Sequence, residues 1–137
     1  MKTKTQNSRK GNMIFLFVAL SLCLVSKTNA QELWKTNPKQ CIVLHDTVGV
    51  KMTLITLAPG ESLAPHTHSL FQAYVVEGGD LEGQTPGTAP TKSTLPTGLH
   101  FQALAMGVHT DKNVGTTTVK LLVVEIFPSK DQKGKTK

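Results

Sequence analysis

The stretch that decides the fold is "GESLAPHTHSLFQAYVVEGG", residues 60–79. It holds two histidines one residue apart, His66 and His68, and it ends in a pair of glycines. Residues i and i+2 of a β-strand point to the same face. The two imidazoles can therefore converge on one metal ion, each at roughly 2.0–2.1 Å from it. The pair alone is weak evidence, because two solvated histidines in a loop have the same sequence pattern.

The spacing around the histidine pair is more specific than the pair itself. The stretch reads G-x5-H-x-H-x3-Q-x6-G, and about forty residues downstream His109 precedes Asn113 with three residues between them. This resembles the cupin superfamily, whose first motif is G-x5-H-x-H-x3-4-E-x6-G and whose second ends in H-x3-N. Two departures stand out. Gln72 replaces the acid of the first motif, and residues 104–106 replace the Pro-x-Gly of the second.

The resemblance covers roughly residues 42–127 and implies a fold and a site. The fold is all-β, a single jelly-roll barrel of antiparallel strands. The site is one divalent transition metal inside the barrel, with Fe, Mn, Ni, Zn and Cu as the candidates that tolerate imidazole ligands. Carried over onto this sequence, the implied ligands are His66, His68, Gln72 and His109.

Gln72 sets the chemistry expected of such a site. Its side-chain carbonyl can ligate a metal, but it adds no negative charge and cannot act as a general base. A divalent ion held by neutral ligands would favour an anionic substrate that supplies the missing charge. Tyr74 has the same strand parity as Gln72, so we expect it to line the pocket, with core packing as the alternative. His100 is a second candidate for the pocket, with a strand position outside the site as its alternative.

The first thirty residues resemble a secretory signal peptide. A basic leader precedes the apolar segment "MIFLFVALSLCLV", residues 13–25, and short side chains lead up to Ala30. At about 1.5 Å per residue this segment reaches roughly 20 Å, short of the roughly 30 Å hydrocarbon core of a bilayer. We expect cleavage after Ala30, export to the periplasm or the medium, and no stable membrane insertion afterwards. Lipid attachment at Cys23 is the weaker alternative, because bulky Leu22 precedes it.

The charge of the chain argues against a nucleic-acid partner. The whole sequence has 15 basic and 9 acidic residues, a formal net charge of +6. Five of the basic residues lie in residues 1–30, and four lysines lie in the last eight residues. Residues 31–129 hold 6 basic and 8 acidic side chains, so the domain offers no basic face for nucleic acid. The lysine-rich residues 129–137 are expected to be a disordered, solvated tail.

The rest of the chain predicts short strands separated by turns. In residues 48–57 apolar side chains alternate with Lys51 and Thr53, which predicts a half-buried strand. Residues 83–98 are rich in Pro, Gly and Thr and are expected to be a loop. Further strands are expected at 71–77, 99–106 and 117–127. The predicted organisation is a signal peptide (1–30), an irregular arm that covers a sheet edge (31–41), the cupin domain (42–128) and the tail (129–137).

Three functions are open on the sequence alone. The first is a metal-dependent enzyme, dioxygenase-like or isomerase- or lyase-like, that acts on a small oxygen-rich or aromatic molecule. The second is a non-catalytic barrel that binds a metal or a small ligand. The third is a structural barrel without a metal. Fold analogy does not separate the first two, because function belongs to the site. A homodimer is expected from the family alone.

Overall fold

The computed structural model of the protein describes residues 31–127, which form one short helix and nine strands. The predicted signal peptide and the whole of the predicted tail lie outside these residues. In chain order the elements are α1 (Leu33–Thr36), β1 (Cys41–Thr47), β2 (Val50–Leu57), β3 (Ser62–His68), β4 (Leu70–Glu77), β5 (Gly79–Gln84), β6 (Thr91–Leu95), β7 (His100–Ala103), β8 (Met106–Asn113) and β9 (Val119–Ile126).

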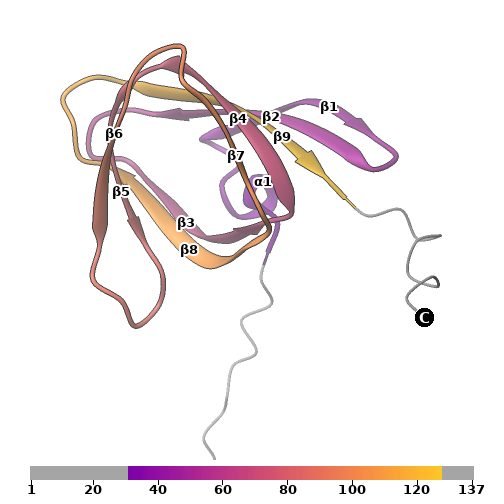
Figure 1. Cartoon of the computed structure of the whole chain (residues 1–137), viewed down its shortest axis with the longest axis horizontal. Helices are drawn as coiled ribbons and strands as arrows, with labels where there is room; N and C mark the ends of the chain where they lie inside the picture. Colours follow the sequence, from indigo (N-terminus) through magenta and orange to yellow (C-terminus); the bar gives the residue numbers. More distant parts are fainter. Residues whose placement is uncertain (1–30, 128–137) are drawn as a thin grey trace, which may run out of the picture.

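The strands form two antiparallel sheets that face each other. One sheet has five strands in the order β1-β2-β9-β4-β7, and the other has four in the order β3-β8-β5-β6. Most strands that are neighbours in a sheet are far apart in the sequence. The chain therefore crosses repeatedly from one sheet to the other (Figure 1). This is the all-β jelly-roll barrel expected from the motifs, and the fold prediction is confirmed.

The core lies between the sheets. The face of β2 that is buried in it carries polar residues as well as apolar ones. The alternation predicted for residues 48–57 is present, but the buried side carries Lys51 and Thr53 together with Ile55 and Leu57. The Lys51 amine reaches an Asp46 carboxylate oxygen at 2.6 Å, so its charge is paired while its stem is buried. The rest of the core comes mainly from β4 and β9, through Phe71, Ala73, Val75, Val119, Leu121 and Val123.

The segment expected to be one loop, residues 83–98, contains a strand. Thr91–Leu95 forms β6 and pairs with β5 over five positions, from Gly79 with Leu95 to Gly83 with Thr91. Its side chains are mostly exposed, so it has no alternation of apolar residues to reveal it in the sequence. The strand exists because β5 offers it backbone hydrogen bonds, and this pairing is a tertiary effect.

Asn113, the last residue of the second motif, joins two turns on the same end of the barrel. The Gly60 nitrogen donates to the Asn113 carbonyl at 2.9 Å, and the Asn113 nitrogen donates to the Glu61 carbonyl at 2.9 Å. Its buried side-chain amide donates to the carbonyls of Leu57 and Thr117, both at 2.8 Å. The turn between β2 and β3 is thereby fixed to the turn between β8 and β9. The two histidine strands, β3 and β8, start and end at this joint.

The arm before β1 packs against β3, an outer strand of the four-stranded sheet. The Thr67 nitrogen donates to the Gln31 carbonyl at 3.3 Å, and Leu33 is fully buried in the core. Asn37 accepts a hydrogen bond from the Ala64 nitrogen at 2.6 Å. The arm includes the single turn α1, and among residues 31–127 no helix is long and apolar enough to cross a membrane.

Candidate metal centre

Two irregularities in β3 aim both of its histidines into the barrel. The pairing of β3 with β8 shifts register between Leu63 and His66 and again between His66 and His68. Pro65 lies in the first shift and has no N–H to give to a ladder, which favours a bulge there. The bulge changes the parity of the strand, so Leu63, His66 and His68 are all buried although they are three and two residues apart.

The neighbouring strand β8 brings His109 directly opposite His66. Their Cα atoms are partners in the sheet, and their ring centres lie 4.3 Å apart. The ring centre of His68 is 4.9 Å from that of His66 and 5.3 Å from that of His109. One ring nitrogen from each histidine lies within 4.8 Å of the other two, so the three imidazoles can share one metal ion. The structure thus brings together the three predicted histidine ligands.

Each of the three rings makes a hydrogen bond through Nδ1. The partners are the Ala64 carbonyl for His66 at 2.9 Å, the Gly107 carbonyl for His109 at 2.8 Å, and a carboxylate oxygen of Glu125 for His68 at 3.1 Å. All three partners are acceptors, which assigns the hydrogen to Nδ1 in each ring. Nε2 then carries the lone pair in all three rings. An Nδ1–H held by an oxygen is the usual second shell of a histidine that ligates a metal.

His66 is the most deeply placed of the three histidines. It has no exposed surface, and its Nε2 atom has no hydrogen-bond partner among the described residues. Burial lowers the pKa of His66 to about 4, and nearby His109 and His68 act in the same direction, against a hydrogen bond to Ala64 that raises it. His66 is therefore neutral at pH 7 and offers a lone pair in a place that water does not reach. An unpaired buried nitrogen is costly unless something binds it.

Glu125, on β9, is a buried acid that the sequence analysis did not identify. Its side chain is 2 % exposed, and one of its oxygens accepts hydrogen bonds from His68 Nδ1 and from the Ser69 nitrogen at 3.2 Å. The signal for it was a single charged residue within the apolar run "LLVVEIF". Such a residue on the inner parity of a strand has to be paired, and here it is paired with a histidine of the cluster.

Asp111 is the second acid that the sequence analysis missed. Its Oδ2 atom lies 3.5 Å from His109 Nε2 and 3.6 Å from His66 Nε2. Burial raises the pKa of Asp111, while the charges of His109 and His68 act against that shift. The sequence carried a usable signal, because His109 and Asp111 are two residues apart on one strand, as are His66 and His68.

Gln72 does not lie at this site, and its assignment as a ligand is corrected. On β4 the residues Phe71, Ala73 and Val75 are buried, and Gln72 is exposed on the outer face between them. The family motif allows three or four residues before its acid. With four, the position falls on Ala73, which lines the barrel interior. Because side chains alternate between the two faces of a strand, a shift of one residue moves the side chain to the other face.

The two residues expected in the pocket share the outer face with Gln72. Tyr74 is 47 % exposed, and its sheet partner on β7 is His100, which is also exposed. Neither lines the cavity inside the barrel. Their neighbours of opposite parity, Ala73 and Phe101, line it instead. Parity correctly placed Tyr74 with Gln72, but both were assigned to the wrong face.

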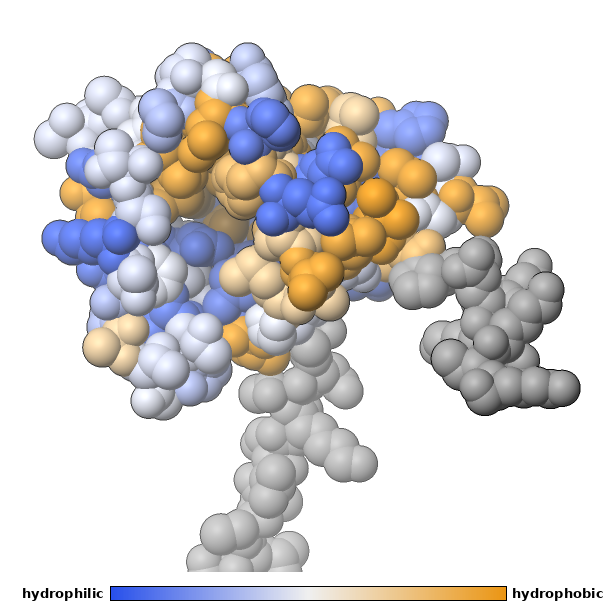
Figure 2. Space-filling model, viewed as in Figure 1, coloured by the Kyte–Doolittle hydropathy of each residue, from blue (hydrophilic) through white to orange (hydrophobic). Residues whose placement is uncertain are grey.

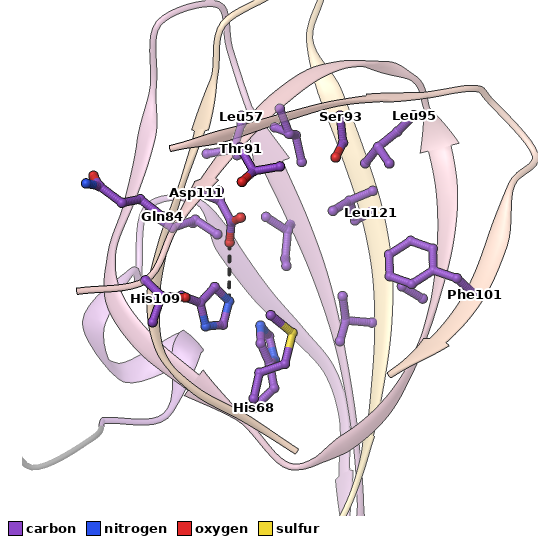
Figure 3. Close-up of a pocket in the computed structure, with 18 of the residues that line it drawn as sticks. Leu57, His68, Gln84, Thr91, Ser93, Leu95, Phe101, His109, Asp111 and Leu121 are labelled. Carbon is purple, nitrogen blue, oxygen red and sulfur yellow. Dashed lines mark ion pairs between the residues drawn. The ribbon is translucent and has the colours of Figure 1, made fainter. Parts of the chain in front are cut away.

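A cavity of about 500 Å³ opens beside the histidine cluster. His68, His109 and Asp111 line it, whereas His66 lies behind them. Its walls are mainly apolar and come from both sheets; Figure 3 shows Leu57, Leu95, Phe101 and Leu121 on the side away from the histidines. Thr91 and Ser93 add hydroxyl groups above Asp111 in this view. Figure 2 shows the surface hollowed where the space between the sheets reaches the outside.

The donor set fits a divalent transition ion. Three neutral imidazoles suit Zn, Cu, Fe and Ni. The unpaired Nε2 atom of buried His66 and the acceptor-bound Nδ1 atoms are the features expected of ligands rather than of core histidines. In residues 31–127 this is the one cluster of histidine, cysteine and acidic side chains with such geometry.

Comparisons with known proteins agree with this fold. No family model matches the sequence, and a search of curated proteins finds no match. A cupin domain from Bordetella pertussis is similar in structure, with 25 % identity, a TM-score of 0.59, and coverage of 64 % of this chain and 92 % of that one. An RmlC-like cupin with a double-stranded β-helix fold from Methanocaldococcus jannaschii is 18 % identical, with a TM-score of 0.54 and coverage of 69 % and 84 %. The chain has the fold of these cupin domains, a double-stranded β-helix of antiparallel strands.

Proposed function

We propose that the protein binds one divalent transition metal through His66, His68 and His109, and that this centre transforms a small molecule held in the adjoining cavity. The observation that carries the proposal is the common orientation of the three imidazoles. Each is fixed through Nδ1 to an acceptor, so the three Nε2 lone pairs are left for a shared ion. Packing alone gives no reason for three such rings to meet.

The open side of the cluster favours catalysis over a purely structural metal. Structural sites close the metal off with four protein ligands, whereas catalytic sites leave a position for water or substrate. Two of the three histidines line the cavity, and the third lies behind them. A molecule in the cavity therefore has direct access to whatever the histidines hold. A metal bound there supplies a Lewis acid or a redox centre.

The cavity selects a molecule with an apolar body and a polar end. Its volume of about 500 Å³ lies within the range of sites for small ligands. Phe71 and Phe101 stand on its walls, and their ring centres are 6.2 Å apart in an edge-to-face arrangement that suits contact with a flat ring. The polar end of such a molecule would point toward a metal held by His68 and His109, whose rings line the same cavity. This arrangement supports an aromatic substrate over a sugar-like one.

Metal analysis of the purified protein tests the first half of the proposal. We expect about one transition ion per chain in the wild type, and a large loss of that ion in His66→Ala and in His109→Ala. His45→Ala is the matched control, because His45 is exposed on β1 and far from the cluster in the sheet order. Equal metal content in all four proteins would overturn the proposal.

A turnover screen tests the second half. The metal-loaded protein is given aromatic and oxygen-rich compounds, and both product formation and oxygen uptake are followed. Conversion that disappears in His109→Ala supports an enzyme. A compound that binds in the cavity and is recovered unchanged from the loaded protein would assign a non-catalytic binding function instead.

A further inference from the structure

Asp111 places a carboxylate oxygen beside two of the three histidines of the cluster. Its Oδ2 atom is nearly equidistant from His109 Nε2 and His66 Nε2, at 3.5 Å and 3.6 Å. The side chain is 25 % exposed and faces the cavity. In Figure 3 it points from β8 down toward His109, and the dashed line joins the two residues. Asp111 thus approaches His66 and His109 from the side of the cavity.

The hydrogen-bond pattern makes this approach unfavourable unless a proton or a metal ion lies between the atoms. The rings of His66 and His109 use their Nδ1 hydrogens on backbone carbonyls, so each Nε2 turns a lone pair toward the carboxylate. Lone pairs on nitrogen and on a carboxylate oxygen repel one another when no hydrogen lies between them. A metal ion shared by all of them turns this repulsion into coordination. The three histidines form the group whose ligand atoms lie close together, and Asp111 adjoins that group beside His66 and His109.

We propose that Asp111 is the acidic ligand of the metal, supplied by β8 and the second motif instead of by β4 and the first. The proposal rests on the metal function above and adds a residue to it. It explains how the centre tolerates Gln72, whose side chain lies outside the barrel, and Ala73, which is buried at the alternative position and has no donor atom.

An acidic ligand changes which metals and substrates fit the site. Three neutral imidazoles would leave a divalent ion its full charge, whereas Asp111 lowers the net charge of the centre to one. An anionic substrate is then not required to balance the ion. A carboxylate also raises affinity for Mn and Fe relative to a site made of imidazoles alone. At a six-coordinate ion, four protein ligands leave two positions for a substrate that enters from the cavity.

The test is titration of the chelator-treated protein with Mn²⁺ and with Zn²⁺, for the wild type and for Asp111→Asn. Loss of an outer partner of a ligand typically weakens metal affinity 10–100-fold, so loss of a charged ligand should weaken it by at least about 10-fold. We expect the larger loss for Mn²⁺, because Zn²⁺ depends more on the imidazoles. Glu82→Gln is the control. Glu82 lies on the neighbouring strand β5, where its sheet partner is Lys112, the residue next to Asp111. The substitution removes the same charge at a residue that does not line the cavity.

Melting temperatures separate a ligand from a merely structural residue. Without metal, Asp111→Asn should melt at the wild-type temperature or above it, because an Asn amide can donate to a histidine lone pair. With metal, the stabilisation should be smaller than in the wild type. Wild-type metal affinity in Asp111→Asn, together with a loss in His66→Ala, would overturn the role of Asp111 and leave the metal function intact. Absence of metal binding by the wild type itself would overturn both.

Discussion

The histidines of the cluster differ in what holds their Nδ1 hydrogens. Backbone carbonyls hold His66 and His109, whereas a carboxylate holds His68. A carbonyl fixes the orientation of a ring, but a carboxylate also makes the other nitrogen a better donor to a metal. Glu125 is buried, and among the described residues its one ion-pair partner is His68. We therefore infer that Glu125 makes the Nε2 atom of His68 a better donor to a metal.

Glu125→Gln should weaken metal affinity by about 10-fold to 100-fold, the usual effect of losing a carboxylate behind a histidine ligand. The Gln oxygen can still accept from His68, so the ring keeps its place and the charge is what is lost. The metal-free protein should not lose stability, because a neutral isostere replaces a buried charge. Calorimetric titration with Zn²⁺ measures the effect. Glu77→Gln, an exposed change that affects only the ion pair with Lys120, should bind as the wild type does.

Substitutions of Gln72 should leave the metal affinity unchanged. Because its side chain points out of the barrel, neither Gln72→Glu nor Gln72→Leu should change the metal affinity. Stability should stay within about 0.5 kcal/mol of the wild type, as for most surface substitutions. Metal titration and thermal melting of both variants check this. A rise in affinity in Gln72→Glu would show that the side chain reaches the ion after all.

At the scale of elements, Gly78 lets two segments of the backbone pack closely. A Cβ added at Gly78 would overlap the Leu95 carbonyl oxygen and lie 2.7 Å from the Thr97 nitrogen. Both are backbone atoms of the β6–β7 region and cannot turn away as a side chain can. The end of β4 therefore packs directly on the connection that follows β6, which keeps the far wall of the cavity in place.

Gly78→Ala should destabilise the fold by about 1–3 kcal/mol or more, the usual cost of forcing a group into a packed region. The matched control is Gly107→Ala, since a Cβ there meets no atom within 4 Å and the backbone does not adopt a positive φ. Gly107 keeps its carbonyl for His109 in the variant. Chemical denaturation of the two variants gives the comparison. Equal stabilities would contradict the close approach.

At the scale of the whole molecule, the arm that follows Ala30 is part of the domain. The Gln31 carbonyl accepts from β3, Leu33 is fully buried, and Asn37 binds the backbone of β3 next to Pro65. The Lys51 amine lies 3.6 Å from the ring centre of Trp34, which adds a cation–π contact between the arm and β2. The arm thus supports the strand that carries two of the three histidines.

The exported protein should begin at Gln31, because the leader pattern ends at Ala30. A short side chain at Ala30 suits the expected cleavage, and the contacts of the arm start at the next residue. N-terminal sequencing or intact mass of the exported product measures this. An exported product that keeps residues 1–30, or one that carries a lipid on Cys23, would show that the leader is processed differently.

The strand pattern and the histidine pair were predictable because they depend on local spacing. Alternation in residues 48–57, the H-x-H step and the H-x3-N step are local patterns, and each was read directly from the chain. The placement of His109 beside the pair came from the family resemblance and not from spacing, since about forty residues separate it from His68. The structure gives the physical reason for that placement, which is the pairing of β3 with β8 in a register that sets His66 against His109.

The sequence by itself determined that strands alternate, that His66 and His68 share a face, and that Gln72 and Tyr74 share another. Only the tertiary structure decided which face of each strand is inside. Alternation tells which residues share a face, but not whether that face points into the barrel or out of it. The bulge at Pro65 and the packing of β4 made that choice. It moved Gln72 outside, brought Asp111 of β8 beside His66 of β3, and brought Glu125 of β9, in the other sheet, to His68.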